Sequence, residues 1–316
     1  MSRFDRQGFL GADSEQKLGG ATLGIVGLGG GGSHIAQQTG HLGIGGYVIV
    51  DPDVITNTNT NRLIGGKLSD VEQETTKVAI ANRLVSGLLE HPRIMSICDS
   101  WHNATEELMR CDVIVGAVDS FKERDQLERF ARRHLIPYID MGMDIHPLKG
   151  GNYLIGGQVI LSMPGKACLH CCGVITEDRL KEEAGRYGEA GSRPQVVWSN
   201  GVLASTAVGL VVQLLTPWFG TPSEFIYLDY DGNRGTLVPN DRMELLRNKA
   251  CPHHPADEVG DPLFDVQGYC SDMAEREAGK YSLNGAAHQN NWVRHIWTSS
   301  YRRICAAWFE IFAKDR

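Results

Sequence analysis

Short apolar runs alternate along the chain with longer stretches in which apolar residues recur every three or four positions. Apolar side chains fill most positions of residues 21–26, 47–51 and 112–119, as is typical of strands buried on both faces. The remaining predicted elements are helices over residues 33–40, 78–89, 123–134 and 201–215 and strands over 137–140, 158–163 and 225–230. This alternation predicts an α/β fold with a doubly wound, mostly parallel sheet.

Two later segments break the pattern. Residues 175–194 are charged and glycine-rich, which predicts either a mobile loop with one helical turn or an ordinary surface loop. Residues 289–312 carry a helical apolar stripe, so we expect a C-terminal extension that ends in an amphipathic helix. That stripe either packs on its own domain or offers a surface to a partner. We therefore divide the chain into a main domain, residues 1–254, and an extension, residues 255–316.

Composition narrows the class of protein. The chain has 316 residues, 42% of them hydrophobic, and its apolar runs are shorter than a membrane span. The N-terminus lacks the apolar segment of a secretory signal. A formal net charge of −7 makes a nucleic-acid partner unlikely, because such binders usually carry a basic surplus. Eight cysteines without a signal indicate thiols and metal ligands, hence a cytoplasmic protein.

A glycine-rich loop follows the first predicted strand. Glycine fills every position from 27 to 32 except Leu28, and GxGxxG begins at Gly27. Such a loop lets backbone amides and a helix N-terminus approach phosphate, as in Rossmann-like domains. Asp51 ends the next strand, where a carboxylate can hold ribose hydroxyls. The glycines expected against a nucleotide are Gly27, Gly29, Gly30 and Gly32. These features alone also suit an NAD(P)-dependent oxidoreductase.

The residues around this loop favour a triphosphate over a dinucleotide. Cations and extra carboxylates follow the strand ends, and further cations stand at the N-terminus. They are Asp53, Asn59, Arg62, Lys77, Asp119 and Arg124, with Arg3 and Arg6 upstream. Arginine and lysine neutralise phosphate charge, and a carboxylate can hold Mg²⁺ beside it. A site that cleaves ATP needs such a set, whereas an NAD site has little use for it.

Two short metal-ligand motifs lie far apart in the second half of the chain. Cys168 and Cys171 form a CxxC pair, and Cys251 and His254 repeat its spacing about 80 residues later. Two such pairs predict a closed, tetrahedral and therefore structural zinc site. His253 could replace His254 as the fourth ligand. The alternative is that the cysteines are buried, reduced and without metal.

In combination, these motifs resemble the ThiF/MoeB/HesA family, the bacterial relatives of ubiquitin-activating enzymes. The matching stretches are "RFDRQ", "GIVGLGGGGS", "VIVDPDVITNTNTNR", "VGAVDSFKER" and "GVLASTAVG", in order between residues 3 and 254. Many family members carry CxxC at both metal-ligand positions, so the histidine here is a departure that keeps a competent ligand.

The resemblance implies an activity and residue roles. The expected reaction is ATP-dependent adenylation of the C-terminal carboxylate of a ubiquitin-like or sulfur-carrier protein that ends in glycine. A peptide or a tRNA-borne carboxylate is the alternative substrate. The implied roles are ribose binding for Asp51, phosphate contacts for Asn59, Arg62 and Lys77, and Mg²⁺ binding at the reaction centre for Asp119. An arginine, Arg3 or Arg6, is expected to reach into the partner subunit's site, which implies a homodimer.

A thioester-forming cysteine is not expected on this chain. Family members that form a thioester place a cysteine before the helix that begins "GVLA", but "PQVVWSNGVLAS" has none. Cys172 and Cys270 are the less favoured candidates for a thioester-forming cysteine. The apolar surroundings of Cys98, Cys111 and Cys305 suggest core positions. A catalytically silent scaffold is a further alternative, but it would have no need for the full set of charged residues.

Overall fold

A single sheet organises the described part of the chain, and its order is β3-β2-β1-β4-β5-β6-β7-β8. The computed structural model describes residues 3–185, 194–216, 218–255 and 258–277. The five strands β3, β2, β1, β4 and β5 pair in parallel. Strands β6, β7 and β8 each pair antiparallel to the strand before them in this order. The strands are β1 (Thr22–Val26), β2 (Gly46–Val50), β3 (Arg93–Ile97), β4 (Val113–Gly116), β5 (Tyr138–Pro147), β6 (Tyr153–Ser162), β7 (Ile226–Asp231) and β8 (Thr236–Pro239). The Rossmann-like arrangement is thereby confirmed.

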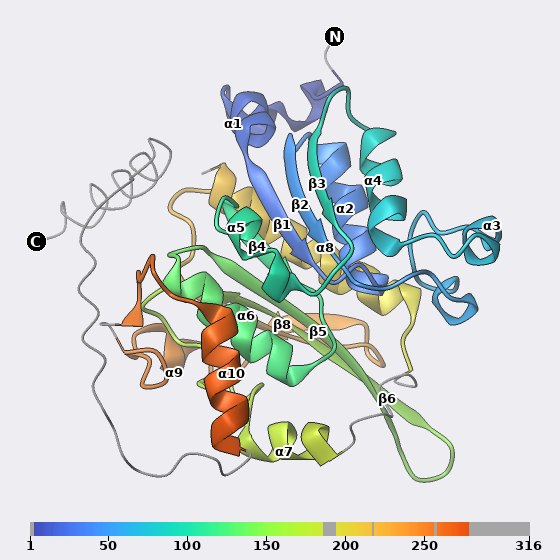
Figure 1. The fold of residues 1–316 in the computed structure, drawn as a ribbon. Helices are drawn as coiled ribbons and strands as arrows, with labels where there is room; N and C mark the ends of the chain where they lie inside the picture. Colours follow the sequence, from blue (N-terminus) through green and yellow to red (C-terminus); the bar gives the residue numbers. More distant parts are fainter. Residues whose placement is uncertain (1–2, 186–193, 217, 256–257, 278–316) are drawn as a thin grey trace, which may run out of the picture. The chain divides into compact units, whose positions relative to one another are not determined.

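Helices cover both faces of this sheet (Figure 1), with α2, α4 and α8 on one face and α5 and α6 on the other. The α-helices are α1 (Ser14–Gly20), α2 (Gly30–Leu42), α3 (Leu68–Glu72), α4 (Lys77–Ser86), α5 (Thr105–Leu108), α6 (Phe121–Arg133), α7 (Glu177–Gly185), α8 (Val197–Leu215), α9 (Met243–Arg247) and α10 (Val266–Glu277). Three 3-10 helices are η1 (Asp5–Leu10), η2 (Asn57–Asn59) and η3 (Trp101–Asn103).

Successive side chains of the central strands point to opposite faces of the sheet, and both faces are covered, which explains the continuous apolar runs. In β1, Leu23 and Ile25 pack under α2 and α8, whereas Val26 packs on the α6 side. All three are at most 2% exposed. Because each face has its own helical layer, every strand position needs an apolar side chain.

The connections from β1 place a crevice at its carboxyl end. The chain leaves β1 through the glycine loop and α2 and returns to β2, while β4 pairs on the other side of β1. Ligands of open α/β sheets bind where the strand order reverses in this way. The carboxyl ends of β1, β2 and β4 carry the glycine loop, Asp51 and Asp119, as the sequence pattern requires.

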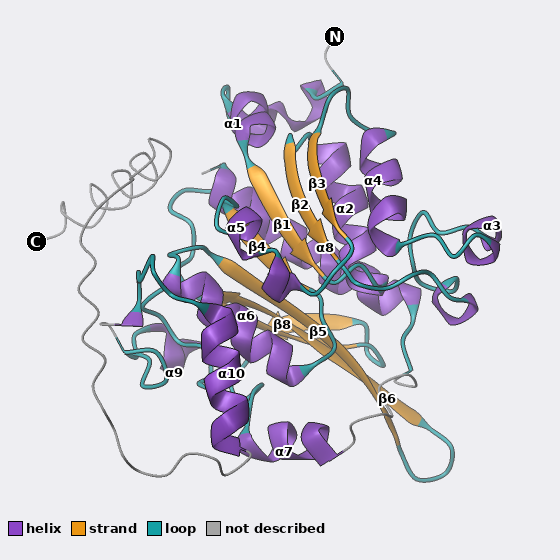
Figure 2. Cartoon of the chain, in the orientation of Figure 1, coloured by secondary structure: helices purple, strands orange, loops and turns teal. Residues whose placement is uncertain are grey.

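Several elements differ from the sequence-based expectation. β5 and β6 are ten residues each and form a long hairpin whose turn extends beyond the helices (Figure 2). Residues 177–185 form the nine-residue helix α7, which is longer than the single turn expected. The edge strands β3 and β8 were not predicted, because their exposed, mixed polarity lacks a clear apolar period.

The boundary of the main unit lies later than residue 254. This unit runs from Met1 to Ser271, and the second unit is Asp272–Arg316. Residues after 254 pack on α6: Glu258 pairs with Arg129 and Arg133 at 3.2 and 2.8 Å. Arg133 also lies over the Phe264 ring, 4.9 Å from its centroid. The amphipathic helix predicted over residues 289–312 lies outside the described residues.

One helix qualifies the expectation that no segment could span a membrane. Among the described residues, α8 is long and apolar enough to do so by length and composition alone. Its buried side chains Leu203, Ala207 and Val211 belong to the core cluster beneath α2, so α8 packs as the core helix of a globular domain does.

Candidate functional site

The glycine loop is held in a conformation that only glycine accepts at two of its positions. Gly27 has φ of +87°, and a Cβ there would lie 2.5 Å from the Ala117 carbonyl oxygen. A Cβ on Gly32 would collide with the Gly27 carbonyl oxygen. Gly29 precedes α2 as its N-cap, and a Cβ built on it meets no described atom within 4 Å. The loop therefore leaves room for a ligand beside the N-terminus of α2.

Asp51 joins this loop to a lysine. Its carboxylate accepts hydrogen bonds from the backbone N–H groups of Leu28 (2.6 Å) and Asp53 (2.9 Å), and only 4% of the residue is exposed. Lys77 Nζ lies 3.4 Å from Asp51 Oδ1 and 2.6 Å from Asp53 Oδ2. Burial raises the pKa of Asp51, and the Lys77 charge opposes that shift. Three of the predicted site residues therefore meet at the end of β2.

Arg62 reaches the same loop from the segment after β2. Its Cδ lies 3.4 Å from the position of a Cβ on Gly30, and its Nη1 donates to the Thr58 carbonyl oxygen at 2.5 Å. Its Nε is buried and has no hydrogen-bond partner among the described residues. A half-exposed guanidinium whose Nε is an unused donor beside the glycine loop fits a bound phosphate. Nucleotide phosphates are thus compatible with the residues present.

Two asparagines behave differently from each other at this loop. Asn59 was predicted to contact phosphate, but its Oδ1 accepts from the backbone and hydroxyl of Thr56, both at 3.0 Å, and so stabilises the η2 turn. Asn200 was not predicted, yet its side chain lies against Gly30 from the first turns of α8. Only the tertiary contact of α8 with α2 brings Asn200 there.

Asp119 lies just beyond β4, and its carboxylate meets a side chain from another element. Gln195 Nε2 donates to both Asp119 oxygens, at 3.1 and 3.2 Å. Glu123, one turn into α6, shares this corner. Its pKa is raised by burial and by the negative charges of Glu183, Asp119, Asp51 and Asp53. Sequence reasoning missed Gln195 and Glu123, although both stand in stretches already singled out. A divalent cation would find carboxylate oxygens here, the donors that Mg²⁺ prefers.

Helix α7 docks on the N-terminus of α6. The Glu183 carboxylate accepts from the backbone N–H groups of Phe121 (3.1 Å) and Lys122 (3.0 Å). The Arg179 guanidinium lies over the Phe121 ring, 5.3 Å from its centroid. Residues before and after positions 186–193 thus contact the same corner, since Gln195 holds Asp119 from the other side.

Arg124 does not face the crevice as a free cation. It is 5% exposed and forms an ion pair with Asp140, whose carboxylate is fully buried. The Tyr138 hydroxyl donates to the same carboxylate at 3.3 Å. This buried pair ties the start of α6 to β5, so the contribution of Arg124 is to position α6 and not to bind phosphate.

Arg3 and Arg6 lie at the end of the sheet opposite to the glycine loop. The Arg3 guanidinium donates to the Leu88 carbonyl oxygen beyond the end of α4, and Gln7 of η1 donates to the Leu42 carbonyl at the end of α2 (2.9 Å). The 13 residues of α2 separate this end from the glycine loop, a length of about 20 Å. Within one chain, neither arginine can reach the loop.

The cysteine pairs come together as a compact group with a histidine. The Sγ–Sγ distances are 3.7 Å for Cys168–Cys171 and 3.8 Å for Cys171–Cys251. His253 Nδ1 lies 3.5 Å from the sulfurs of both Cys168 and Cys171. Tetrahedral zinc bonds of about 2.3 Å to sulfur and 2.0 Å to nitrogen give edges of about 3.8 and 3.5 Å. The donor set and spacing fit zinc, and we call these four residues the cysteine cluster.

His253, and not the predicted His254, lies with the three cysteines. His254 is 4% exposed and turns toward α6, where its Nε2 lies 3.9 Å from Glu128 Oε2. Burial lowers the pKa of His254 to about 3, so this contact is not an ion pair. Equal spacing of the two motifs suggested His254, but the backbone after Cys251 presents the nearer histidine.

A buried polar network supports the first cysteine loop from α6. Glu128 is fully buried and accepts from the Ser162 hydroxyl (2.5 Å) and from the backbone N–H of Leu169 (3.1 Å), next to Cys168. Arg132 donates to the carbonyl oxygens of Lys166 and Ala167, at 2.9 and 2.8 Å. These bonds shape the loop that presents Cys168 and Cys171.

Cys172 and Cys270 do not have the features of an activated nucleophile. Burial raises the pKa of Cys172 and of Cys270, which lowers the thiolate fraction that a thioester requires. Cys111 is buried, as expected for a core position, but Cys98 is exposed just after β3, which corrects its assignment to the core. Cys305 lies outside the described residues.

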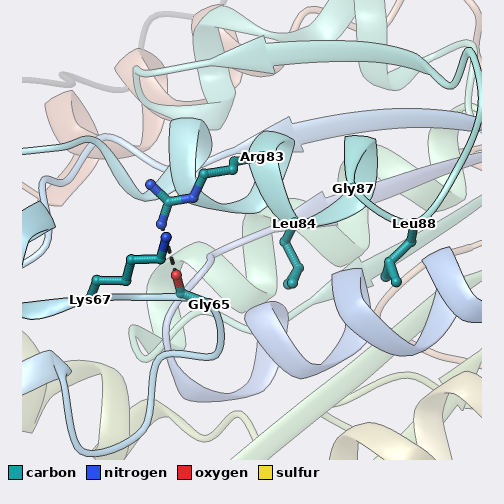
Figure 3. A pocket seen from close by; sticks show the side chains of 6 residues that line it. All are labelled: Gly65, Lys67, Arg83, Leu84, Gly87 and Leu88. Atoms are coloured by element: carbon teal, nitrogen blue, oxygen red, sulfur yellow. Dashed lines mark hydrogen bonds between the residues drawn. The ribbon is translucent and has the colours of Figure 1, made fainter.

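A pocket lies between α4 and the segment that precedes α3 (Figure 3). Lys67, Arg83, Leu84 and Leu88 line it together with Gly65 and Gly87. The Arg83 guanidinium already donates to Asp70 at 2.8 and 2.7 Å and to the Gly65 carbonyl oxygen at 2.8 Å. Because the Arg83 donors are engaged, this pocket lacks the charge pattern found around the glycine loop.

We use the name glycine corner for Gly27–Gly32 together with Asp51, Asp53, Arg62, Lys77 and Asp119.

Comparison with known proteins agrees with this geometry. The chain is 27% identical to ubiquitin-like modifier-activating enzyme 5 of Drosophila willistoni over 253 residues, which cover 72% of this chain and 59% of that protein. It is 28% identical to the sulfur carrier protein ThiS adenylyltransferase of Bacillus subtilis over 79% of this chain and 70% of that one. The chain thus spans about three fifths of the first relative.

Solved structures share the fold. E. coli MccB with ATP superposes with a TM-score of 0.62 at 18% identity, covering 84% of this chain and 74% of that one. PaaA superposes with a TM-score of 0.56 at 19% identity, covering 75% and 72%. The sequence model of the ThiF family matches residues 4–253. The chain therefore belongs to the ThiF family.

Proposed function

We propose that this protein adenylates the C-terminal carboxylate of a small protein or peptide with MgATP. The observation that carries the proposal is the glycine corner, where an open glycine loop, the Asp51–Lys77–Asp53 group, Arg62 and Asp119 meet within a ThiF-family fold. The relatives include enzymes named for activating ubiquitin-like and sulfur-carrier proteins. The family match also favours ATP over the NAD(P) alternative.

In the proposed reaction, the substrate carboxylate attacks the α-phosphate, the bond to the bridging oxygen breaks, and pyrophosphate leaves. The products are an acyl-adenylate and pyrophosphate. A carboxylate is already a competent nucleophile, so orientation and charge neutralisation supply the rate enhancement. Arg62 and Lys77 hold the leaving pyrophosphate. Asp119 holds Mg²⁺, which neutralises phosphate charge when bound.

The cysteine cluster is proposed as a structural zinc site. Its four protein ligands complete a tetrahedron and leave no position for substrate. Zinc there would cross-link the loop after β6 with the loop after α9. The free thiols of the seven described cysteines suit a reducing compartment, so we also propose a cytoplasmic location.

The substrate class has three candidates. The similarity to activating enzymes favours a ubiquitin-like or sulfur-carrier protein with a glycine tail, whose acyl group would pass to a downstream thiol. The fold likeness to MccB favours a peptide, because MccB structures contain the peptide MccA. A tRNA-borne carboxylate is supported by 28% identity over 134 residues to a tRNA threonylcarbamoyladenosine dehydratase.

ATP–pyrophosphate exchange with the purified full chain tests the proposal. Candidate ubiquitin-like proteins and short peptides are added one at a time, with Asp119→Ala as the control. Exchange that requires one substrate and its free C-terminal carboxylate, and that Asp119→Ala abolishes, supports adenylation. MgATP binding without exchange for any protein or peptide redirects the search to RNA. A chain that binds NAD and not MgATP contradicts the proposal.

A homodimer would explain how a distant arginine completes the site. The outward side of α8 exposes Trp198 (57%) and Val202 (39%) at its start. Beyond its end, Trp218 stacks edge-to-face on Phe9 of η1, 5.5 Å between ring centroids. Two α8 helices packed antiparallel about a two-fold axis would bring the partner's η1, with its Arg6, to the glycine corner.

Mixing two inactive variants tests this arrangement. If Arg6 acts in the partner's site, equal amounts of Arg6→Ala and Asp119→Ala chains form heterodimers with one complete site. Random pairing then restores about a quarter of wild-type exchange. Arg3→Ala is run in parallel, because either arginine was predicted to take this role. No restoration, or a monomer in solution, contradicts the dimer proposal and leaves the adenylation assay unaffected.

A further inference from the structure

Gln195 makes an unusual contact for a residue next to a candidate cation ligand. Its Nε2 is nearly equidistant from the two Asp119 carboxylate oxygens, at 3.1 and 3.2 Å. The amide therefore contacts both carboxylate oxygens at once, as a chelating cation also does. An N–H donor and a cation cannot share the same oxygen lone pairs.

The surroundings of Asp119 favour a cation over an amide. Asp119 is exposed, so an ion can reach it from solvent. Asp51, Asp53, Glu183 and Asp119 act together on Glu123, so negative charge accumulates at this corner. Lys77 is engaged with Asp51 and Asp53. A neutral amide satisfies two oxygens but removes no net charge, whereas a divalent cation does both.

Gln195 also connects Asp119 to α8. It stands two residues before Val197, where α8 begins. Asn200, one turn further, lies against Gly30 of the glycine loop. The start of α8 therefore touches both the candidate cation ligand and the phosphate loop, and a change at Gln195 can be felt at both.

We infer that the Gln195 amide and the divalent cation compete for the same side of Asp119, so that loading of the cation displaces Gln195. The inference rests on the proposed function only in taking Asp119 as a cation ligand. Gln195 is thus a positioning residue that holds Asp119 until the cation arrives. It sets the cation concentration at which the site becomes competent, and it links that event to the first turn of α8.

Mn²⁺ binding to the full chain tests the competition without relying on turnover. Free Mn²⁺ is followed by electron paramagnetic resonance during titration of wild type, Gln195→Ala and Gln195→Glu. If the amide occupies the carboxylate about nine-tenths of the time, removing it tightens the apparent Kd about tenfold. Gln195→Glu adds a carboxylate ligand and binds Mn²⁺ more tightly still. Asp119→Asn removes the site and shows which fraction of binding the titration reports.

Gln267→Ala is the matched control, since the Gln267 amide donates to the His102 carbonyl oxygen (2.8 Å) and to Asn103 (3.0 Å) and contacts neither Asp119 nor the loop. Its Mn²⁺ affinity equals that of wild type. Equal or weaker Mn²⁺ binding by Gln195→Ala overturns the competition, and so does the absence of Asp119-dependent binding in every variant. Pyrophosphate exchange separates the failure of this inference from the failure of the proposed adenylation. Unchanged Mn²⁺ affinity in a Gln195→Ala enzyme that still exchanges pyrophosphate contradicts only the competition between Gln195 and the cation. Tighter binding in a protein that never exchanges pyrophosphate defeats adenylation alone.

Discussion

The glycine corner and the cysteine cluster are assembled in opposite ways. The corner takes its side chains from the ends of neighbouring parallel strands, and backbone hydrogen bonds such as Leu28 N–H to Asp51 hold it. The cysteine cluster joins side chains as far as 80 residues apart in sequence, from loops without regular structure. The strand pairing exists without the corner, whereas the contacts between the two cysteine loops include those of the cluster itself.

This difference indicates that the glycine corner serves the reaction and the cysteine cluster serves the stability of the fold. The corner concentrates negative charge and leaves cations and glycines beside open space, which is unfavourable for the fold but suits a phosphate substrate. Cys168, Cys251 and the Glu128 network behind them are buried, and the four ligands of the cluster leave no open coordination position, which suits a structural role. We therefore expect substitutions at the corner to change activity more than folding, and substitutions at the cluster to do the reverse.

The largest effect is expected from removing one thiolate of the cluster. Cys171→Ser should lower the free energy of unfolding by about 3 kcal/mol or more, because structural zinc sites supply folding energy directly. Zinc content by mass spectrometry should fall well below one per chain, and thermal unfolding should shift in parallel. Cys98→Ser is the matched control, since Cys98 is exposed and outside the cluster. Full zinc content in Cys171→Ser would mean that the cluster does not hold the metal.

Asp119→Ala is expected to show the opposite profile. Loss of the cation ligand should reduce pyrophosphate exchange at least about 100-fold, equivalent to about 2.7 kcal/mol. The free energy of unfolding should change by less than about 0.5 kcal/mol, because Asp119 is exposed. Exchange and urea unfolding are measured on the same preparation. A strong loss of stability in this variant would break the separation between the two regions.

The adjacent histidines sharpen the description of the cluster. His253→Ala should weaken zinc binding about 10- to 100-fold, since its Nδ1 faces two sulfurs. His254→Ala should keep zinc and lose about 1–3 kcal/mol of stability by leaving a cavity beside Glu128. Competition with a zinc chelator gives the affinities, and urea unfolding gives the stabilities. The reverse order would restore His254 as the ligand.

Glu123→Gln should give the smallest effect, and its sign depends on pH. The folded-state pKa of Glu123 is raised from 4.5, so the folded protein binds this proton more tightly than the unfolded chain does. The stability it contributes is complete below pH about 4.3 and is lost as pH rises through the folded pKa. Glutamine mimics the protonated form, so the variant should be more stable than wild type at pH 8 and match it near pH 4. Urea unfolding at both pH values measures the difference in the free energy of unfolding between the variant and wild type. An equal difference at pH 4 and pH 8 would mean that the negative charge of the corner does not act on Glu123.

The sequence by itself determined the alternation of strands and helices, the doubly wound class of the sheet and the place of the glycine loop. Parallel strands buried on both faces need apolar residues at every position, and their carboxyl ends must share one edge. Asp51 and Asp119 could therefore be placed at this edge from position alone, whereas their roles and that of Lys77 came from the family resemblance. The edge strand β3 escaped detection, because half-exposed strands do not impose a strong apolar period.

Only the tertiary structure decided which side chains from distant elements complete each site. Gln195 and Asn200 reach the corner because α8 packs on α2, and nothing in their own stretch announces it. Arg124 carries the charge of a phosphate ligand, yet Asp140 on β5 takes it into the core. The choice of His253 over His254 depends on the path of one loop. Local pattern encodes how a segment folds, whereas long-range packing selects its neighbours, and those neighbours decide what a polar side chain does.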